Sequence, residues 1–102
     1  MIEYKDIKTK LAAKRSNTKY FTKAFFESFK KAERTAAENA RRGIDDKYYK
    51  NGIYLCEAYN DIYNSDFYNK NGGTYCAFLQ IYREAQKAEE RKTAYNERSA
   101  TT

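Results

Sequence analysis

The chain has 102 residues, with 20 Lys or Arg against 14 Asp or Glu, which gives a net charge of +6. A chain of this length predicts one domain with a modest core. It contains no His, Pro or Trp. Without His, neither a Ser-His-Asp or Cys-His catalytic set nor a His-ligated metal site can form. The composition therefore favours a non-enzymatic protein that carries no cofactor.

Aromatic residues make up 17% of the chain, which favours a folded domain over a disordered one. The apolar runs are too short for a transmembrane helix. Acidic residues occupy positions 3 and 6, where a signal peptide would need a basic and then an apolar segment. We therefore expect a cytoplasmic protein that does not interact with a membrane.

Apolar spacing predicts a first helix over about residues 3–15, with a narrow stripe formed by Tyr4, Ile7 and Leu11. Residues 16–18 are all cap-type and predict a short break. A second and longest helix is expected over residues 19–42, ending at Gly43 after two basic residues. Its apolar face has Phe residues in the N-terminal half and Ala residues in the C-terminal half. These residues are Phe21, Phe25, Phe29, Ala32, Ala36 and Ala40.

Two structures compete after Asp45 and Asp46. Helical spacing over Tyr48, Gly52, Leu55, Tyr59 and Ile62 predicts a third helix. The Asn51-Gly52 pair, flanked by aromatic and aliphatic residues, is also typical of a two-residue hairpin turn. The helix is the main expectation, a hairpin over residues 47–56 is the alternative, and a helix that begins only at Ile53 is a third option.

Residues 65–73 predict a loop, because they lack apolar periodicity and end in two glycines. Thr74 then caps a fourth helix that runs to about Tyr95. We expect residues 1–98 to form a single helical domain and residues 99–102 a polar tail.

Together these segments predict an all-α fold, an irregular four-helix bundle with one long central helix. An α+β fold with the 47–56 hairpin is the alternative. The expected core consists of Phe21, Phe25, Phe29, Leu55, Tyr59, Ile62, Phe78, Leu79 and Tyr82.

Positive charge is concentrated in the N-terminal part of the chain. Residues 1–42 contain twelve Lys or Arg against five Asp or Glu, whereas residues 43–82 contain three against five. Four basic residues share the face of the second helix opposite its Phe residues: Lys23, Lys30, Arg34 and Arg41. Such a row could contact phosphates, but interleaved Glu27 and Glu38 suit an ordinary solvated face or a patterned contact with an acidic protein surface better.

Tyrosine is concentrated in the middle of the chain, where eight of the 11 lie between positions 48 and 82. Two facing helices cannot bury that many phenols without partners for the hydroxyl groups. Tyr49, Tyr54 and Tyr68 are expected on a polar face or near loops, and Tyr is common in binding surfaces. We assign these three, with Phe26 and the basic row, as candidate partner-binding residues. The alternative is that the Tyr residues form part of the core and that their hydroxyl groups reach solvent at its edges.

Phe26 lies off the apolar face of the second helix. Either another helix packs on it or it is an exposed anchor for a partner. Cys56 and Cys76 are expected to be reduced core thiols rather than a disulfide or a zinc site. The Asx-rich stretch at 61–69 lacks the spacing of a calcium loop, so no metal is expected.

The sequence thus favours a small non-enzymatic protein that binds and occupies a macromolecular partner, most simply a protein with an acidic patch. Its small, motif-poor, Tyr-rich profile resembles accessory proteins of phages and mobile elements, including inhibitors of host defence such as anti-CRISPR proteins. That resemblance implies action in the host cytoplasm. A basic nucleic-acid-binding protein using the N-terminal helices is the alternative, and self-association into a homo-oligomer is left open.

Overall fold

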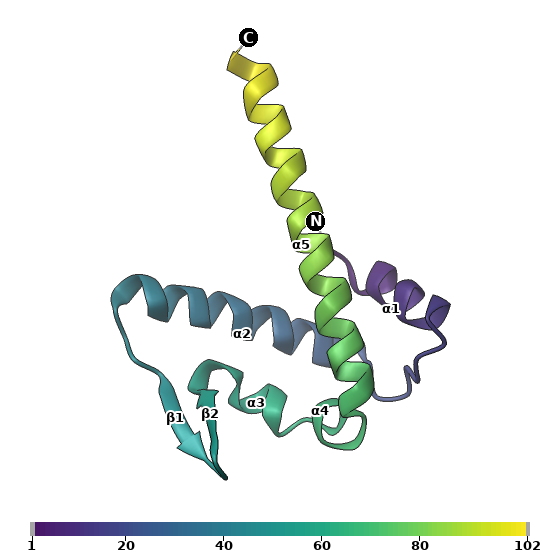
Figure 1. The fold of residues 1–102 in the computed structure, drawn as a ribbon, viewed down its shortest axis with the longest axis vertical. Helices are drawn as coiled ribbons and strands as arrows, with labels where there is room; N and C mark the ends of the chain where they lie inside the picture. The colour runs from purple at the N-terminus through teal and green to yellow at the C-terminus, as the bar shows by residue number, and fades with distance from the viewer. Residues whose placement is uncertain (1, 102) are drawn as a thin grey trace. The chain divides into compact units, whose positions relative to one another are not determined.

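The computed structural model describes residues 2–101, and the side chains of residues 2–92. It is mostly helical with one small antiparallel hairpin, which agrees with the α+β alternative (Figure 1). In chain order the elements are α1 (Tyr4–Ala13), α2 (Lys23–Arg42), β1 (Lys47–Lys50), β2 (Ile53–Cys56), the 3-10 helix η1 (Glu57–Tyr59), α3 (Asn60–Tyr63), α4 (Asp66–Lys70) and α5 (Gly72–Thr101).

The chain divides into two compact units, which are described separately. One unit comprises residues 19–72 and contains α2, the hairpin, η1, α3 and α4. The other comprises the segment before residue 19 and the segment after residue 72, which contribute α1 and α5. None of the helices in the described part of the chain is long and apolar enough to cross a membrane.

The expected third helix is wrong over its first half, where the chain forms the β1–β2 hairpin. Asn51 has a φ of 53° and Gly52 a φ of 81°. A two-residue turn of the type favoured in hairpins needs positive φ at both central positions, which a right-handed helix does not allow. The strands pair Lys47 with Cys56 and, at the turn, Lys50 with Ile53. The helical pattern holds only for the single turn of α3.

The second helix begins four residues later than predicted, at Lys23. The Thr22 hydroxyl accepts a hydrogen bond from the backbone N–H of Phe25 at 3.1 Å, so Thr22 caps the helix instead of a residue in 16–18. The predicted end is confirmed, because Gly43 adopts a left-handed conformation with φ of 73°. The first helix also agrees with its prediction, over Tyr4–Ala13.

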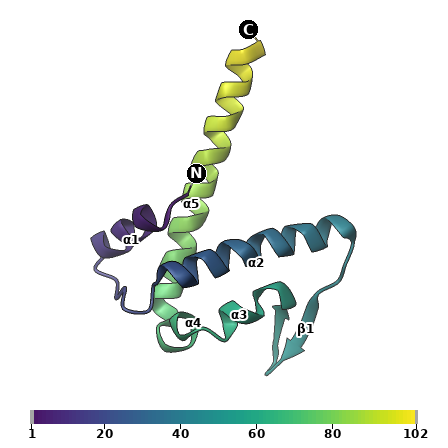
Figure 2. The same ribbon diagram turned by 180° about the vertical axis from the view of Figure 1, so that it is seen from behind.

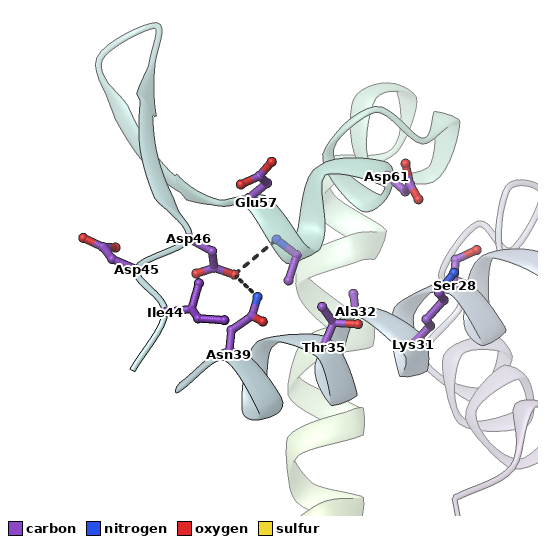
Figure 3. Close-up of a pocket in the computed structure, with 11 residues that line it drawn as sticks. Ser28, Lys31, Ala32, Thr35, Asn39, Ile44, Asp45, Asp46, Glu57 and Asp61 are labelled. Atoms are coloured by element: carbon purple, nitrogen blue, oxygen red, sulfur yellow. Dashed lines mark hydrogen bonds between the residues drawn. The ribbon is translucent and has the colours of Figure 1, made fainter. Parts of the chain in front are cut away.

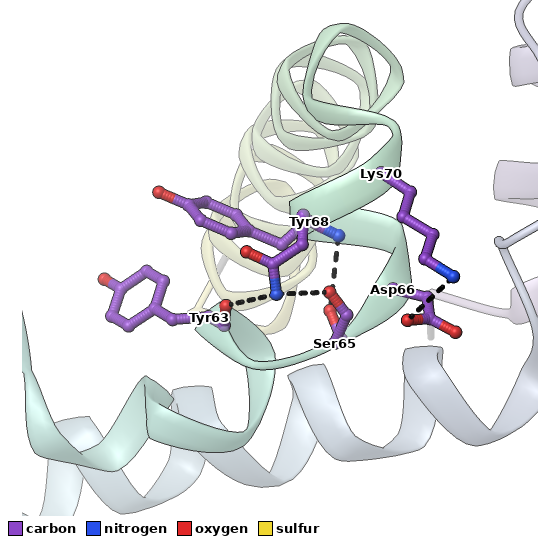
Figure 4. Close-up of polar contacts among 6 residues, drawn as sticks. Tyr63, Ser65, Asp66, Tyr68 and Lys70 are labelled. Carbon is purple, nitrogen blue, oxygen red and sulfur yellow. Dashed lines mark hydrogen bonds and ion pairs between the residues drawn. The ribbon is translucent and has the colours of Figure 1, made fainter.

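The expected loop at 65–73 contains the short helix α4 (Figure 4). Ser65 caps it, because its hydroxyl accepts a hydrogen bond from the backbone N–H of Tyr68 at 3.3 Å. The Asn69 amide donates to the carbonyl oxygens of Tyr63 and Ser65, each at 3.0 Å. This local network turns the chain and places Phe67 in the interior. The following helix, α5, begins at Gly72 rather than at Thr74 and includes residues 99–101; Thr102 lies outside the described residues.

A cluster of Phe rings forms the core of the unit made by residues 19–72. The Phe67 ring centroid lies 4.7 Å from that of Phe25 and 5.4 Å from that of Phe21. Phe29 stacks on Phe25 and also contacts Tyr59. The prediction is therefore confirmed for the three Phe residues of the α2 region, and Phe67 was missed because it lies in a segment without periodicity.

The remaining core predictions are confirmed in part. Ile62 is buried, whereas Leu55 and Tyr59 are half-buried. In the other unit Phe78 and Tyr82 are buried as expected and Leu79 is half-buried. Four further residues of that unit are buried hydrophobic residues outside the expected core: Ile7, Leu11, Tyr75 and Ile81.

Candidate interaction surface

Exposed apolar side chains gather on and beside the hairpin. Among the side chains described (residues 2–92), the exposed large hydrophobic residues are Tyr54 at 77%, Tyr49 at 64%, Ile53 at 59% and Ile44 at 50%. A single exposed apolar residue is ordinary on a protein surface, but a contiguous group of them marks an interaction site. All four lie within eleven consecutive residues, 44–54.

The pairing register explains why two of these side chains form a unit. Tyr49 lies opposite Tyr54, and side chains of directly opposed residues point to the same face of a sheet. Their rings meet edge to face with centroids 5.2 Å apart. Lys47 and Cys56, two residues away on each strand, share this side. We call Lys47, Tyr49, Tyr54 and Cys56 the aromatic face.

The opposite face of the hairpin is held to the rest of its unit. Tyr48 lies on that face and its hydroxyl donates a hydrogen bond to the Asn60 side-chain oxygen at 2.9 Å. Figures 1 and 2 show the hairpin projecting from the end of α2, with its turn farthest from the helix. The hairpin is therefore anchored near its base through Tyr48, while Tyr49 and Tyr54 on one face and Ile53 on the other remain exposed.

Asp46 fastens the base of the hairpin. Its Oδ2 accepts hydrogen bonds from Asn39 Nδ2 at 3.2 Å, from the Cys56 thiol at 3.0 Å and from the backbone N–H of Ala58 at 3.4 Å. Figure 3 shows Asp46 and Asn39 facing each other between the hairpin base and α2. One carboxylate thus connects the strand base, η1 and α2.

These contacts change the pKa values of both acidic groups. The hydrogen bonds from Cys56 and then from Asn39 lower the pKa of the Asp46 carboxyl from its ordinary value. Burial, followed by the hydrogen bond to Asp46, raises the pKa of the Cys56 thiol. At neutral pH the pair is therefore a thiol that donates and a carboxylate that accepts.

We expect this carboxylate to make stability depend on pH. Because the pKa of Asp46 is lowered by folding, its contribution is present above the ordinary carboxyl pKa of 3.8 and is lost as the pH falls through the lower folded value. In urea unfolding, the wild-type protein should exceed Asp46→Asn in stability at pH 7, and the difference should shrink below pH 3.8. Cys56→Ala is the control: it keeps the carboxyl and should raise the pKa of Asp46 in an NMR titration. A stability difference between wild type and Asp46→Asn that does not change with pH would contradict the role given to the Asp46 carboxylate.

A cavity of about 430 Å³ lies beside this junction (Figure 3). It is bounded by α2, the segment before β1, η1 and the start of α3. Its charged lining residues are Lys31, Asp45, Asp46, Glu57 and Asp61. Within the described part of the chain, no group of three or more His, Cys, Asp or Glu is placed to hold a metal ion. The cavity is acidic, and Asp46, whose side chain lines it, already accepts three hydrogen bonds.

The predicted basic row lies along α2, but only part of it carries uncompensated charge. Lys23 and Arg34 are exposed and form no ion pair with a described residue. Lys30 lies 3.9 Å from Glu27. Arg41 pairs with Glu38, which also accepts from Arg42 at 2.9 Å. The row therefore resembles a solvated helix surface with two exposed, unpaired cations more than a continuous phosphate track.

The other predicted residues lie in different surroundings. Phe26 is 1% exposed, with its ring 6.2 Å from Phe21 and 5.2 Å from the Lys30 ammonium, so it is packed rather than presented as an anchor. Tyr68 is half-buried on α4, 5.3 Å from the Tyr63 ring (Figure 4). The rings of Tyr49 and Tyr54 are in contact with each other. Tyr68 does not belong to this pair, because its ring contacts Tyr63 of α3.

The cysteine prediction needs correction. Both thiols are free, but neither is fully buried: Cys56 is half-buried and Cys76 is exposed. Cys56 lies on a hairpin strand with one open side, and Cys76 lies outside the buried stripe of α5. Ile44 and Ile53 were missed as surface residues, because aliphatic side chains in an apolar pattern are first interpreted as core.

Comparison with protein-family models, with curated proteins and with solved structures found no match to this chain. The candidate surface is therefore defined by its own chemistry: two exposed aromatic rings in contact on one face of the hairpin, exposed Ile53 on the other face, exposed Ile44 shortly before β1, and Lys residues on both faces.

Proposed function

We propose that this protein is a small, non-enzymatic binding protein that uses the β1–β2 hairpin to occupy an acidic surface on a protein partner. The observation that carries the proposal is the clustering of Ile44, Tyr49, Ile53 and Tyr54 in one short, anchored segment. Tyr side chains bury a large area at low entropic cost and are enriched among the residues that dominate binding energy. A preformed hairpin adds to this, because less ordering is needed on binding.

Charge supports an acidic partner. Lys47 and Lys50 lie at the two ends of β1 and form no ion pair with a described residue. Lys23 and Arg34 are likewise available on α2. Cations at the rim of an interface accelerate association with an acidic surface more than they tighten the complex.

Occupation of a surface is also how a small inhibitor acts, because it excludes whatever would bind there. An inhibitor of a host defence system such as CRISPR, encoded by a phage or mobile element and acting in the host cytoplasm, is one form of this proposal. The resemblance in sequence profile supports that form.

Site-specific photo-crosslinking tests the proposal. A photoreactive phenylalanine analogue replaces Tyr54 in one variant and the exposed Gln80 of α5 in the control. In nuclease-treated lysate of the source cells, we expect a protein crosslinked through position 54 and not through position 80, with an acidic crosslinked peptide. Charge reversal at Lys47 and Lys50 should slow capture. Equal crosslinking from both positions, or capture insensitive to charge reversal, would contradict the proposal.

Nucleic acid is the second candidate, and the exposed Tyr49–Tyr54 pair beside unpaired Lys residues is the observation that favours it, since bases stack on aromatic rings. Fluorescence anisotropy with labelled random-sequence single-stranded and duplex DNA separates the two. We expect affinities no tighter than the roughly 10⁻⁶ to 10⁻⁴ M of non-specific binding at physiological salt. Tighter binding that is lost in the double variant Tyr49→Ala/Tyr54→Ala would indicate that the partner is nucleic acid and not a protein.

A further inference from the structure

The segment that contains α1 carries positive charge that is not paired with acidic groups. Residues 7–26 include six Lys or Arg and no Asp or Glu, the longest stretch of the chain without an acidic residue. Among the described residues, the cations of this stretch in or just beyond α1 form no ion pair, whereas Glu27 and Glu38 pair with three cations of α2. These α1 cations are all exposed: Lys8, Lys10, Lys14 and Arg15.

Three of these cations gather at the C-terminal end of α1. Lys10 and Lys14 are four residues apart, so their side chains lie on the same side of the helix, and Arg15 follows directly. The two acidic residues of this region, Glu3 and Asp6, lie at the opposite end of the helix. We call Lys10, Lys14 and Arg15 the basic end of α1.

Arg15 occupies a backbone position that favours glycine, since its φ is 59°. Its N–H donates to the Ala12 carbonyl oxygen at 2.9 Å, and the Ser16 N–H donates to that of Leu11 at 3.1 Å. This is the pattern in which a helix usually ends on a left-handed glycine. The Arg side chain is therefore present at a conformational cost, which indicates a use for its guanidinium other than ending the helix.

We propose that the basic end of α1 binds the phosphate backbone of a nucleic-acid duplex. Arg and Lys, together with polar residues such as the Ser-Asn-Thr at 16–18, are the side chains that contact phosphates most often. Contacts to phosphate carry no sequence information, so this surface binds without sequence preference. It is separate from the aromatic face of the hairpin and does not rest on the proposed function.

The surroundings of the basic end favour a phosphate backbone over other acidic ligands. α1 buries its apolar residues, Ile7 and Leu11, which are 1% and 0% exposed, so it has no apolar face to insert into a lipid surface. Within the described side chains, no exposed large hydrophobic residue lies on α1. A protein interface is usually anchored by such residues, and unpaired bases need exposed rings on which to stack. Binding through charge alone is typical of contacts to the backbone of a duplex.

The number of cations sets the expected strength of binding. Three neutralised phosphates give a slope of about −2.7 when the logarithm of the association constant is plotted against the logarithm of the salt concentration. The dissociation constant should be about 10⁻⁵ to 10⁻⁴ M at physiological salt. At roughly 50 mM salt it should be roughly 20-fold lower, because the slope is steep.

Fluorescence anisotropy with a labelled random-sequence DNA duplex, measured at several salt concentrations, tests the site. Lys10→Gln/Lys14→Gln removes two of the cations and should flatten the slope by about 1.8. Lys87→Gln/Arg91→Gln is the matched control: these two exposed cations of α5 are also four residues apart and lie beside Glu90. The control lowers the net charge by the same amount and should leave the slope unchanged. Equal flattening in both variants, or no binding by the wild-type chain at roughly 50 mM salt, would overturn the proposal.

Arg15→Gly separates binding from folding. The change removes the guanidinium and supplies the residue that a φ of 59° favours. The slope should flatten by about 0.9, while the midpoint of urea unfolding stays the same or rises. Arg15→Lys should retain the wild-type slope. If Arg15 only stabilises the C-terminus of α1 by its charge, Arg15→Gly would lower the midpoint and leave the slope unchanged, which would overturn its assignment to the site.

Two further titrations test the choice of ligand. Tyr49→Ala/Tyr54→Ala should bind the duplex as the wild type does, because the site does not include the hairpin; loss of binding in this variant would assign the duplex to the hairpin and overturn the proposal. Vesicles of phosphatidylcholine with phosphatidylserine should not bind. Binding to these vesicles, or tighter binding to a labelled single strand than to the duplex, would also overturn it.

Discussion

Replacing Phe25 by Ala is expected to lower the free energy of unfolding by about 3–5 kcal/mol. Phe25 is buried and its ring contacts Phe21, Phe29 and Phe67, with centroids 4.7 to 6.4 Å away. Removing it leaves a cavity between α2 and α4, because the neighbouring rings cannot collapse into the space without leaving their own contacts. Urea unfolding followed by circular dichroism measures the loss.

The exposed Tyr54 provides the control for this change. Tyr54→Ala removes an aromatic ring of similar size from a position that is 77% exposed, so the loss should stay within about 1 kcal/mol, the range of one cross-strand ring contact. A loss below about 1 kcal/mol for Phe25→Ala as well would mean that the Phe cluster is not the core of this unit.

Gly52→Ala should destabilise the hairpin by about 1–2 kcal/mol. Gly52 has a φ of 81°, and an added Cβ would meet only the Tyr49 hydroxyl, at 3.7 Å. The cost is therefore conformational and not steric, since L-residues with a Cβ rarely adopt this backbone geometry. Amide hydrogen exchange at the strand residues, which detects opening of the hairpin alone, measures the change.

Gly52→Asn is the matched control at the same site. Asn tolerates left-handed backbone better than Ala does, so its cost should be clearly smaller. A helix through this segment would reverse the pattern, because Ala would then stabilise by up to about 1 kcal/mol relative to Gly. The sign of the Ala variant therefore decides between the two structures that the sequence allows for residues 47–56.

The helices of this protein follow from local chemistry where the local signals agree. α2 has an apolar stripe, basic residues in its last turn and a glycine just beyond, and each feature predicts the same end. Its start was misplaced because Thr22 and the residues at 16–18 are all cap-type, and only the contact with the Phe25 N–H distinguishes them. α4 was missed because five residues are too few to show a period.

The hairpin could be anticipated only as an alternative, because Tyr, Ile and Leu at positions 48–55 satisfy both a helical and a strand pattern. The Asn51-Gly52 turn and the hydrogen bond from the Cys56 thiol to the Asp46 carboxylate favour the hairpin. The exposure of Tyr49 and Tyr54 was expected, but their contact was not, since it arises from the strand register alone. Asp46 has no sequence signal of its own, because its three donors come from separate positions along the chain.

The junction at Asp46 has a consequence for how this protein tolerates change over evolutionary time. One oxygen serves donors from α2, β2 and η1, so the side chain must have both the right charge and the right length. Glu, with one more methylene, would displace the oxygen from all three donors, although on an open surface it is the commonest replacement for Asp. In homologous chains we expect position 46 to vary only together with positions 39 and 56, while the neighbouring Asp45 exchanges more freely.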